Sequence, residues 1–201
     1  IFIKKIVEME NQTALDWLYK WEKEKPNTIY LSQPVDGFWH NWTFSEVANE
    51  VRKMASYINS LELENNSKIG ILSKNCAHWI MSDLAIFLSG HISVPLYPNL
   101  NAESLSQILN HSETKLLFVG KLDDFESQKS AIPQDVNCIS FPFYTEDYPM
   151  WDDVVKDFDP SNDLKRISKE LASIIYTSGT TGKSKGVMHS FSNFSFATIN
   201  A

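Results

Sequence analysis

The feature that most constrains the fold is a regular alternation, between Lys68 and Phe141, of short apolar runs with longer amphipathic segments. Short apolar runs bounded by turn residues are typical of buried strands, and they are predicted at 69–72, 92–96, 116–119 and 136–141. Helices are predicted at 77–89, at 101–110 and, more weakly, near Asp123. This order predicts an α/β fold with a mostly parallel sheet flanked by helices, because helical crossovers join parallel neighbours.

The chain before this alternation predicts a helix, a β-hairpin and a second helix. In TALDWLYKWEKEK (13–25), apolar residues recur at helical spacing, and Pro26 comes next. The Asp36-Gly37 pair between two β-prone runs is a strong hairpin signal. The next helix begins at TFSE (43–46), which has the pattern of a capping box. Its predicted core face consists of Val47, Val51, Met54, Ala55 and Ile58.

The segment 142–163 breaks the alternation with three prolines and six aspartates, so it predicts a surface loop with a short helix at WDDVVKDF (151–158). The acidic residues of that helix, Asp152, Asp153 and Asp157, are expected to be solvated rather than to bind Mg²⁺. The 201 residues thus divide into helix, hairpin and helix (1–67), βαβ units (68–141), loop and short helix (142–170), and a strand, a glycine-rich loop and a C-terminal segment (171–201).

Composition excludes several classes of protein. With 43% hydrophobic residues the chain is globular, and a net charge of −7 opposes binding to nucleic acid. Cys76 and Cys138 lie far apart and match no metal-ligand spacing, so both are predicted to be reduced, small, buried groups. The sequence has the pattern of neither a signal peptide nor a transmembrane segment, which predicts a cytoplasmic protein and leaves peripheral membrane contact open. It does not begin with Met, which suggests a partial chain.

The stretch IIYTSGTTGKSKGV (174–187) carries three of the seven glycines of the chain. From Thr177 to Gly186 it has no apolar side chain, and it lies between two predicted strands, LASIIY (171–176) and GVMHS (186–190). Glycines let backbone amides approach a ligand closely, and the hydroxyls and two lysines add donors and charge. The loop is therefore predicted to bind a polyphosphate.

Two other interpretations of the loop compete with this one. The first is a solvated surface turn, since Ser, Thr and Gly are ordinary turn formers. The second is the P-loop of NTPases, GxxxxGK[ST], because Gly182-Lys183-Ser184 matches its end. The first glycine of that motif would stand at Thr177, and a P-loop opens a helix directly after its lysine, whereas a β-prone run comes next in this chain.

The loop resembles the phosphate-binding signature [ST]SGTTGxPKG of the adenylate-forming enzymes, which include acyl-CoA synthetases, luciferases and the adenylation domains of peptide synthetases. Ser184 replaces the usual proline, and Lys185 matches the signature lysine. Residues 71–119 resemble long-chain fatty-acid CoA ligases, with Asn75, Trp79, Gly90, Pro95 and Pro98 at matching places. WTFSEV (42–47) is similar to their early helix start, so the resemblance covers most of residues 40–194.

The resemblance implies the N-terminal part of an adenylation domain. In this family a carboxylate attacks the α-phosphate of Mg²⁺-bound ATP, and the acyl-adenylate passes its acyl group to the thiol of CoA. Lys185 is then the catalytic charge partner, and Lys183 faces solvent. The implied contacts to the β- and γ-phosphates are Thr177, Ser178, Gly179, Thr180, Thr181, Gly182 and Lys185, and no metal ligand is predicted.

The family's adenine, ribose and C-terminal catalytic elements would come after Ala201, so these 201 residues alone are predicted to be inactive. A long-chain fatty acid is the favoured substrate, while aryl, amino and short acids, and a carrier protein in place of CoA, stay open. Two other functions also stay open: a nucleotide-binding module without catalysis, and a P-loop ATPase or kinase.

Histidines and tryptophans have plainer interpretations. His78 and His111 lie on predicted helices and are expected to be packing or surface residues, and His189 is close enough to the loop for a part in nucleotide or acyl packing. The six tryptophans are expected in the core or at its rim: Trp17, Trp21, Trp39, Trp42, Trp79 and Trp151.

Overall fold

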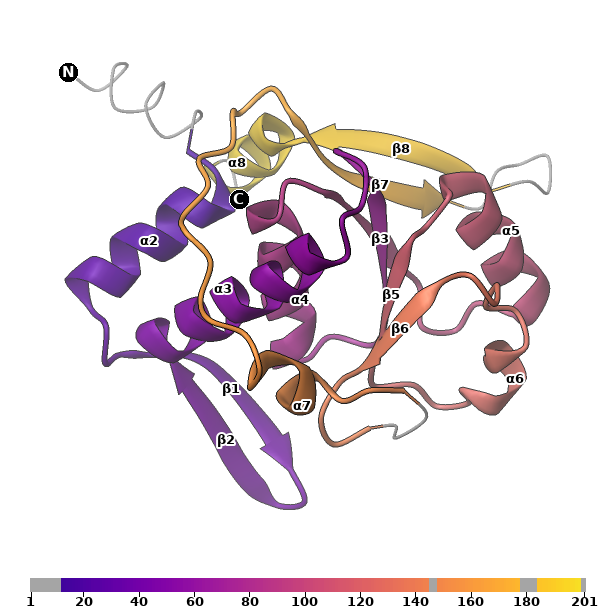
Figure 1. Ribbon diagram of the computed structural model, residues 1–201, viewed down its shortest axis with the longest axis horizontal. Helices are drawn as coiled ribbons and strands as arrows, with labels where there is room; N and C mark the ends of the chain where they lie inside the picture. Colours follow the sequence, from indigo (N-terminus) through magenta and orange to yellow (C-terminus); the bar gives the residue numbers. More distant parts are fainter. Residues whose placement is uncertain (1–11, 145–147, 178–183, 200–201) are drawn as a thin grey trace.

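A six-stranded sheet forms the centre of the computed structural model (Figure 1), which describes residues 12–144, 148–177 and 184–199. Its strand order is β6-β5-β3-β4-β7-β8. These strands are β3 (Lys68–Leu72), β4 (Ile92–Leu96), β5 (Leu116–Val119), β6 (Asn137–Ser140), β7 (Leu171–Thr177) and β8 (Lys185–Ser190). All neighbours are parallel except β7 and β8, so the predicted α/β class and mostly parallel sheet are confirmed.

Helices cover both faces of this sheet (Figure 1). One face packs against α2 (Ala14–Glu24), α3 (Phe44–Ser60), α4 (Ala77–Leu88) and α7 (Trp151–Val155) in a core with Trp151 and Phe118 fully buried. The other face packs against α5 (Ala102–Ser112) and the region of α6 (Glu126–Lys129) in a smaller core. The predicted strands at 92–96 and 116–119 match β4 and β5 residue for residue.

The predicted hairpin is present as a separate two-stranded sheet, β1 (Ile29–Val35) and β2 (Phe38–Thr43). Asp36 and Gly37 form its turn with φ of 50° and 82°, which is the left-handed region that a tight hairpin turn requires. The predicted capping box comes next, because Thr43 Oγ1 accepts from Glu46 N at 3.2 Å and Glu46 Oε2 accepts from Thr43 N at 2.7 Å. The predicted core face of α3 is buried as expected.

The structure corrects the expectation for one tryptophan. Trp39 is 67% exposed, and its neighbour Phe38 is 75% exposed. Both residues come directly after the turn of the β1–β2 hairpin, which projects from the body of the molecule (Figure 1), so Trp39 has no core within reach. The other tryptophans are buried or half-buried.

The segment after β6 returns along the surface to the start of β7. Arg52 on α3 holds it, since its guanidinium binds Glu22 of α2 through two 2.7 Å hydrogen bonds and donates to Asp163 at 2.7 Å. The three aspartates in and after α7 are exposed. Cys76 and Cys138 are free and only half-buried, and burial raises the pKa of the Cys138 thiol to about 11.

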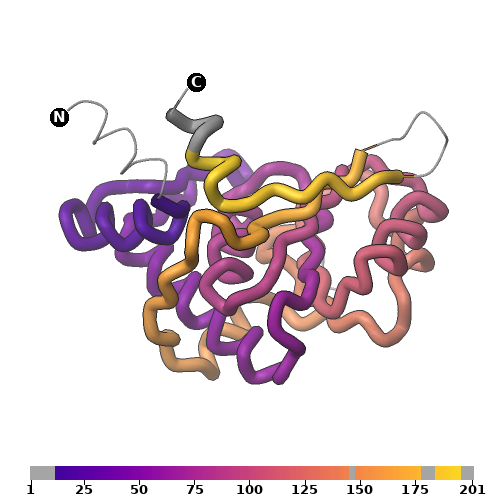
Figure 2. The backbone as a smooth tube through the Cα atoms, turned by 90° about the horizontal axis from the view of Figure 1, so that it is seen from above, coloured from indigo at the N-terminus to yellow at the C-terminus, as the bar shows by residue number. Residues whose placement is uncertain are grey.

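The glycine-rich loop joins two antiparallel strands (Figure 2). Thr177 ends β7 and Lys185 begins β8, and α8 (Phe191–Ile199) comes only after β8. A P-loop would open a helix at this point, so the strand β8 argues against that alternative. None of the helices in the described ranges is both long and apolar enough to span a membrane.

Candidate functional site

The parallel strands β3 to β7 all end at one edge of the sheet, and a cavity of about 590 Å³ lies there. Ligands of open α/β sheets bind at this carboxyl edge. Most of its wall comes from the last two residues of β4 and from residues that follow β3, β4 and β5, together with one residue from β7 and one from α4. The lining residues are Ser73, Lys74, Asn75, Trp79, Pro95, Leu96, Tyr97, Pro98, Lys121 and Ile175.

The strand ends are tied together where they form this wall. Lys74 N donates to Lys121 O at 2.8 Å, and Lys121 N donates to Ser73 Oγ at 2.8 Å. The backbone after β3 is therefore fixed against the backbone after β5. These hydrogen bonds fix the backbone positions from which the Lys74 and Lys121 side chains extend.

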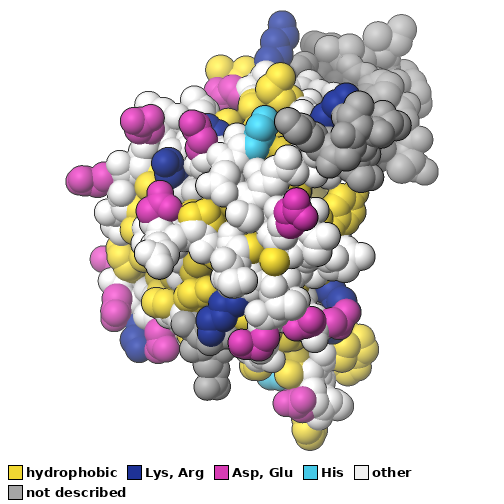
Figure 3. Space-filling view, turned by 90° about the vertical axis from the view of Figure 1, so that its right-hand side faces the viewer, with side chains coloured by type: hydrophobic (Ala, Val, Ile, Leu, Met, Phe, Trp, Pro, Cys, Tyr) yellow, Lys and Arg dark blue, Asp and Glu magenta, His cyan; other side chains and the backbone are white. Residues whose placement is uncertain are grey.

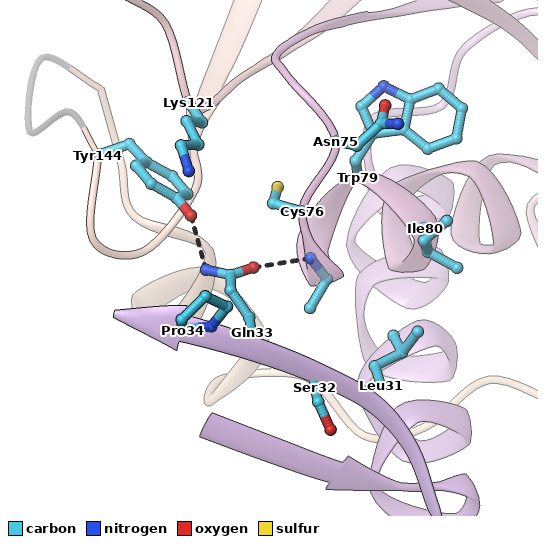
Figure 4. A pocket seen from close by; sticks show the side chains of 11 residues that line it. Leu31, Ser32, Gln33, Pro34, Asn75, Cys76, Trp79, Ile80, Lys121 and Tyr144 are labelled. Atoms are coloured by element: carbon cyan, nitrogen blue, oxygen red, sulfur yellow. Dashed lines mark hydrogen bonds between the residues drawn. The ribbon is translucent and has the colours of Figure 1, made fainter. Parts of the chain in front are cut away.

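A second cavity, of about 430 Å³, adjoins the first, because Asn75, Trp79 and Lys121 line both. Gln33 of β1 crosses it (Figure 4): its Nε2 donates to Tyr144 Oη at 2.6 Å, and its Oε1 accepts from Ala77 N at 2.8 Å. Gln33 thus joins the β1–β2 hairpin to the first turn of α4 and to the segment after β6. We refer to these two adjoining cavities together as the hollow at the carboxyl edge.

Among the residues that the structure describes, two lysines, Lys74 and Lys121, and no Asp or Glu line this hollow. Lys74 forms an ion pair with Asp123, and the exposed Lys121 ammonium lies 6.0 Å from the centre of the Tyr144 ring. Burial raises the pKa of the Cys76 thiol in spite of hydrogen bonds from the Trp79 backbone and Ser73, so this cysteine is not an activated nucleophile. No group of three or more His, Cys, Asp and Glu side chains within the described ranges could hold a metal ion.

The structure places two of the predicted phosphate-binding residues at the same edge. Thr177 and Lys185 are opposite each other in the β7–β8 register, and both side chains are exposed. Ser178, Gly179, Thr180, Thr181 and Gly182, with Lys183, lie outside the described residues. The loop is therefore bounded by a threonine hydroxyl on one arm of the hairpin and a lysine ammonium on the other.

Gly186 has a structural reason of its own. A Cβ there would lie 2.7 Å from Ile174 Cγ2 and 3.3 Å from Tyr176 Cζ, so this glycine is needed for packing between the two arms of the hairpin rather than for contact with a ligand.

The three histidines that the sequence singled out have different surroundings. His78 is 3% exposed among Trp42, Phe141 and Trp151, and its Nδ1 has no hydrogen-bond partner in the described part of the chain. His111 is exposed and forms a hydrogen bond to Tyr176. His189 is half-buried and lies beside Phe194, with ring centres 5.9 Å apart and planes tilted by 39°.

Three wall residues of this hollow, Lys74, Tyr97 and Lys121, were not predicted from the sequence. Each comes directly after a strand or stands one residue beyond that place, so the rule that ligands bind at the carboxyl ends of parallel strands could have found them. Asn75, Trp79, Pro95 and Pro98, which carried only a family resemblance, line the same wall.

Acidic and basic side chains are interspersed over the face of the molecule that carries α5 and α6 (Figure 3), and no broad basic surface is visible on that face. Polyanion binding requires such a surface.

Known proteins resemble this chain over most of its length. The 2-succinylbenzoate–CoA ligase of Bacillus licheniformis is 30% identical over 193 residues, which cover 92% of this chain and 36% of the relative. The long-chain-fatty-acid–CoA ligase FadD15 of Mycobacterium tuberculosis is 27% identical over 198 residues, which cover 92% of this chain and 32% of the relative. The chain thus spans about a third of the length of the relatives that it matches.

The fold is also that of a solved CoA ligase. The crystal structure of the anthranilate CoA ligase AuaEII in complex with anthranoyl-AMP superimposes with a TM-score of 0.77 and 23% sequence identity, covering 90% of this chain and 35% of that one. The family model described as AMP-binding enzyme matches residues 18–201. Because that match takes in nearly all of the helices and strands described above, the chain belongs to the family of AMP-binding enzymes.

Proposed function

We propose that the protein which contains this chain is an acid–CoA ligase. It joins a carboxylic acid to ATP, releases pyrophosphate, and transfers the acyl group of the resulting acyl-adenylate to the thiol of CoA. The observation that carries this proposal is the position of Thr177 and Lys185, the two residues that bound the polar loop in the sequence, at the carboxyl edge of the sheet and near a hollow lined by two lysines. The alternative of a nucleotide-binding module without catalysis differs in forming no acyl-adenylate.

The proposed chemistry is positioning combined with charge stabilisation. As the carboxylate oxygen bonds to the α-phosphorus, the bond to the bridging oxygen breaks and negative charge builds up on the departing pyrophosphate. Donors fixed in place before the reaction stabilise that charge without reorganising. We assign this role to the hydroxyls and backbone amides of Thr177, Ser178, Gly179, Thr180, Thr181 and Gly182, with Lys185 as the catalytic ammonium group.

The residues described are compatible with the phosphates of ATP, since the exposed Thr177 hydroxyl and Lys185 ammonium stand on opposite arms at the loop ends. Mg²⁺ would enter with the nucleotide, as the counter-ion of its phosphates. CoA enters the proposal as the second substrate. We assign a protein ligand to neither the ion nor the thiol.

For the acid we propose a long-chain fatty acid. Its support is the resemblance of residues 71–119 to long-chain ligases and the relatives named as such from Mycobacterium and Arabidopsis thaliana. An aromatic acid is the second candidate, because other relatives are named for succinylbenzoate, anthranilate and benzoate. We also propose a cytoplasmic location, and that residues 1–201 form the N-terminal part of an adenylation domain.

Isotope exchange tests the first half-reaction. The full-length protein is incubated with Mg²⁺, ATP and labelled pyrophosphate, together with palmitate, benzoate or 2-succinylbenzoate in separate reactions. We expect label in ATP only when an acid is present, and fastest with palmitate. Exchange with benzoate alone would replace the fatty acid by an aromatic one, and no exchange with any acid, although ATP binds, would favour the non-catalytic module.

A further inference from the structure

Tyr176 is the last buried residue of β7 before the polar loop. Only 4% of it is exposed, and it packs in the smaller core on the α5 face of the sheet. The next residue, Thr177, is exposed and belongs to the proposed phosphate site. Tyr176 is therefore the point at which the interior of the protein meets the loop.

Its hydroxyl is held by a side chain from a distant part of the sequence. Tyr176 Oη lies 2.7 Å from Nδ1 of His111, in the last turn of α5, and the two rings meet edge to face with centres 5.7 Å apart. Nδ1 of a neutral imidazole can accept a hydrogen bond from the tyrosine hydroxyl or donate one to it, depending on the tautomer. The hydrogen bond can therefore form in either tautomer. Figure 2 shows α5 close to the loop end of the β7–β8 hairpin.

The Tyr176 ring also lies close to β8, the other strand of the hairpin. Tyr176 and Gly186 are register partners, and a Cβ on Gly186 would lie 3.3 Å from the Tyr176 ring. Tyr176 thus links His111 of α5 with its register partner Gly186 of β8. Thr177 and Lys185 are the adjacent residues on the two arms.

The backbone ladder joins this end of β7 to β8, since β7 and β8 pair as far as Thr177 and Lys185. Within the described residues, β4 and β7 pair at Ser93 and Ser173, whereas β3 and β4 pair at five successive positions. The Ser93–Ser173 pair lies away from the carboxyl edge, three residues before Tyr176. The hydrogen bond from Tyr176 to His111 therefore ties this end of the hairpin to α5, beyond the register pair of β7 with β4.

We propose that His111 and Tyr176 are a positioning pair, which fixes the β7–β8 hairpin and so the loop that binds the nucleotide phosphates. The inference rests on the proposed function for the identity of the ligand. Neither side chain touches the phosphates; they act through Thr177 and Lys185, whose places depend on those of Tyr176 and Gly186. Small displacements of groups that orient a reacting phosphate are costly, so a loose hairpin weakens the use of ATP.

Four variants of the full-length protein test this. Tyr176→Phe removes only the hydroxyl, His111→Ala removes its partner, and the double variant removes both. His111→Asn places an amide near the position of Nδ1 and should rescue the bond. Tyr57→Phe on α3 is the matched control, because it removes a tyrosine hydroxyl far from this hairpin.

Amide hydrogen exchange of residues 171–177 and 185–190 is measured alongside KM for ATP and for the acid. We expect each single variant to speed exchange in these strands and to raise KM for ATP about 3–10-fold, with KM for the acid unchanged, as for the loss of one hydrogen bond. The double variant should be no worse than either single one, since both remove the same bond. His111→Asn should lie near the wild type, and Tyr57→Phe should change neither quantity.

Additive effects of the two substitutions would overturn the pair, as would unchanged exchange in β7 and β8. Faster exchange with an unchanged KM for ATP would overturn the link to the phosphate loop and leave a purely structural contact. The wild type could show no ATP-dependent reaction while the variants still speed amide exchange in β7 and β8. The proposed function would then fail, and the positioning of the hairpin by His111 and Tyr176 would stand.

Discussion

In each of the two hairpins an aromatic residue packs against a histidine of the body of the protein, and the two contacts differ in hydrogen bonding and in burial. Trp42 at the base of the β1–β2 hairpin meets His78 of α4 with ring centres 5.7 Å apart and planes at 88°. Tyr176 in the β7–β8 hairpin meets His111 of α5 at 5.7 Å and 86°. Only the second pair is joined by a hydrogen bond.

The difference matches what each hairpin carries at its end. The β1–β2 hairpin ends in the tight Asp36-Gly37 turn, and its histidine is buried and dry, so burial lowers the pKa of His78 to about 4. The β7–β8 hairpin ends in the polar loop, and its histidine stands at the surface. The first hairpin is tied to the body of the protein by packing at Trp42 and by the hydrogen bonds of Gln33, whereas in the second hairpin the contact with histidine itself supplies a directional bond next to the loop.

The largest expected effect lies in the loop of the second hairpin. Lys185→Ala in the full-length protein should cost about 2–4 kcal/mol of transition-state stabilisation, comparable with losing one preorganised donor, seen as a fall in kcat/KM for ATP. Lys183→Ala is the matched control and should cost little. Equal losses from the two substitutions would refute the assignment of Lys185.

The second prediction concerns His78 of α4, the buried histidine that packs against Trp42 of the first hairpin. The unfolded chain takes up a proton on His78 near its ordinary pKa of 6.5, but the folded protein does so only near pH 4, so the free energy of unfolding falls as the pH falls between these values. The contribution is on the order of 2 kcal/mol.

Burial raises the pKa of Asp83 to about 6, which acts in the opposite direction over part of that range. The test is therefore the difference between the wild type and His78→Leu in urea unfolding at about pH 7 and about pH 4.5. The wild type should lose more stability on acidification than the variant. The same loss in both would mean that His78 titrates normally and is not dry.

Substituting one glycine in each hairpin, Gly186 and Gly37, should distinguish a glycine needed for packing from one needed for its backbone conformation. Gly186→Ala brings a Cβ to 2.7 Å from Ile174 and should cost about 1–3 kcal/mol of stability and weaken ATP binding. Gly37→Ala has open space around it but a φ of 82°, so it should cost about 1 kcal/mol and leave ATP binding unchanged. Thermal unfolding and ATP titration of both variants decide this. A Gly37→Ala variant with impaired ATP binding would contradict the division of roles.

The smallest effect is expected at the tip of the first hairpin. Trp39→Ser removes a side chain that is 67% exposed, so stability should change by less than about 0.5 kcal/mol. Urea unfolding measures it. A loss of more than about 2 kcal/mol would show that Trp39 is packed in the full-length protein.

The central sheet could be predicted from the sequence because each buried strand there is a short apolar run between turn signals. The runs at 92–96 and 116–119 match β4 and β5 without error. The capping box at Thr43 and the turn at Asp36 were equally readable, since each depends on residues close in sequence. Local chemistry thus carried most of the fold.

Contacts between distant segments could not be predicted in this way. Nothing local distinguishes His111, which bonds to Tyr176, from His78, which packs without a bond, because the partners lie far away in the sequence. Trp39 was expected in the core because tryptophan usually packs there, but it lies near the tip of the projecting hairpin and is 67% exposed. Of the proposed phosphate-binding residues, the structure places only Thr177 and Lys185.

Lysine footprinting tests most directly whether the β7–β8 loop holds the phosphates of ATP. The full-length protein is treated briefly with an amine-reactive reagent, with and without Mg·ATP, Mg·AMP or pyrophosphate, and modification of each lysine is measured by mass spectrometry. We expect ATP and pyrophosphate to protect Lys185 and AMP to protect it only weakly. Lys183 and Lys115, an exposed lysine directly before β5, should react equally in all conditions. Modification of Lys185 at the same rate with and without saturating ATP would contradict phosphate binding by this loop.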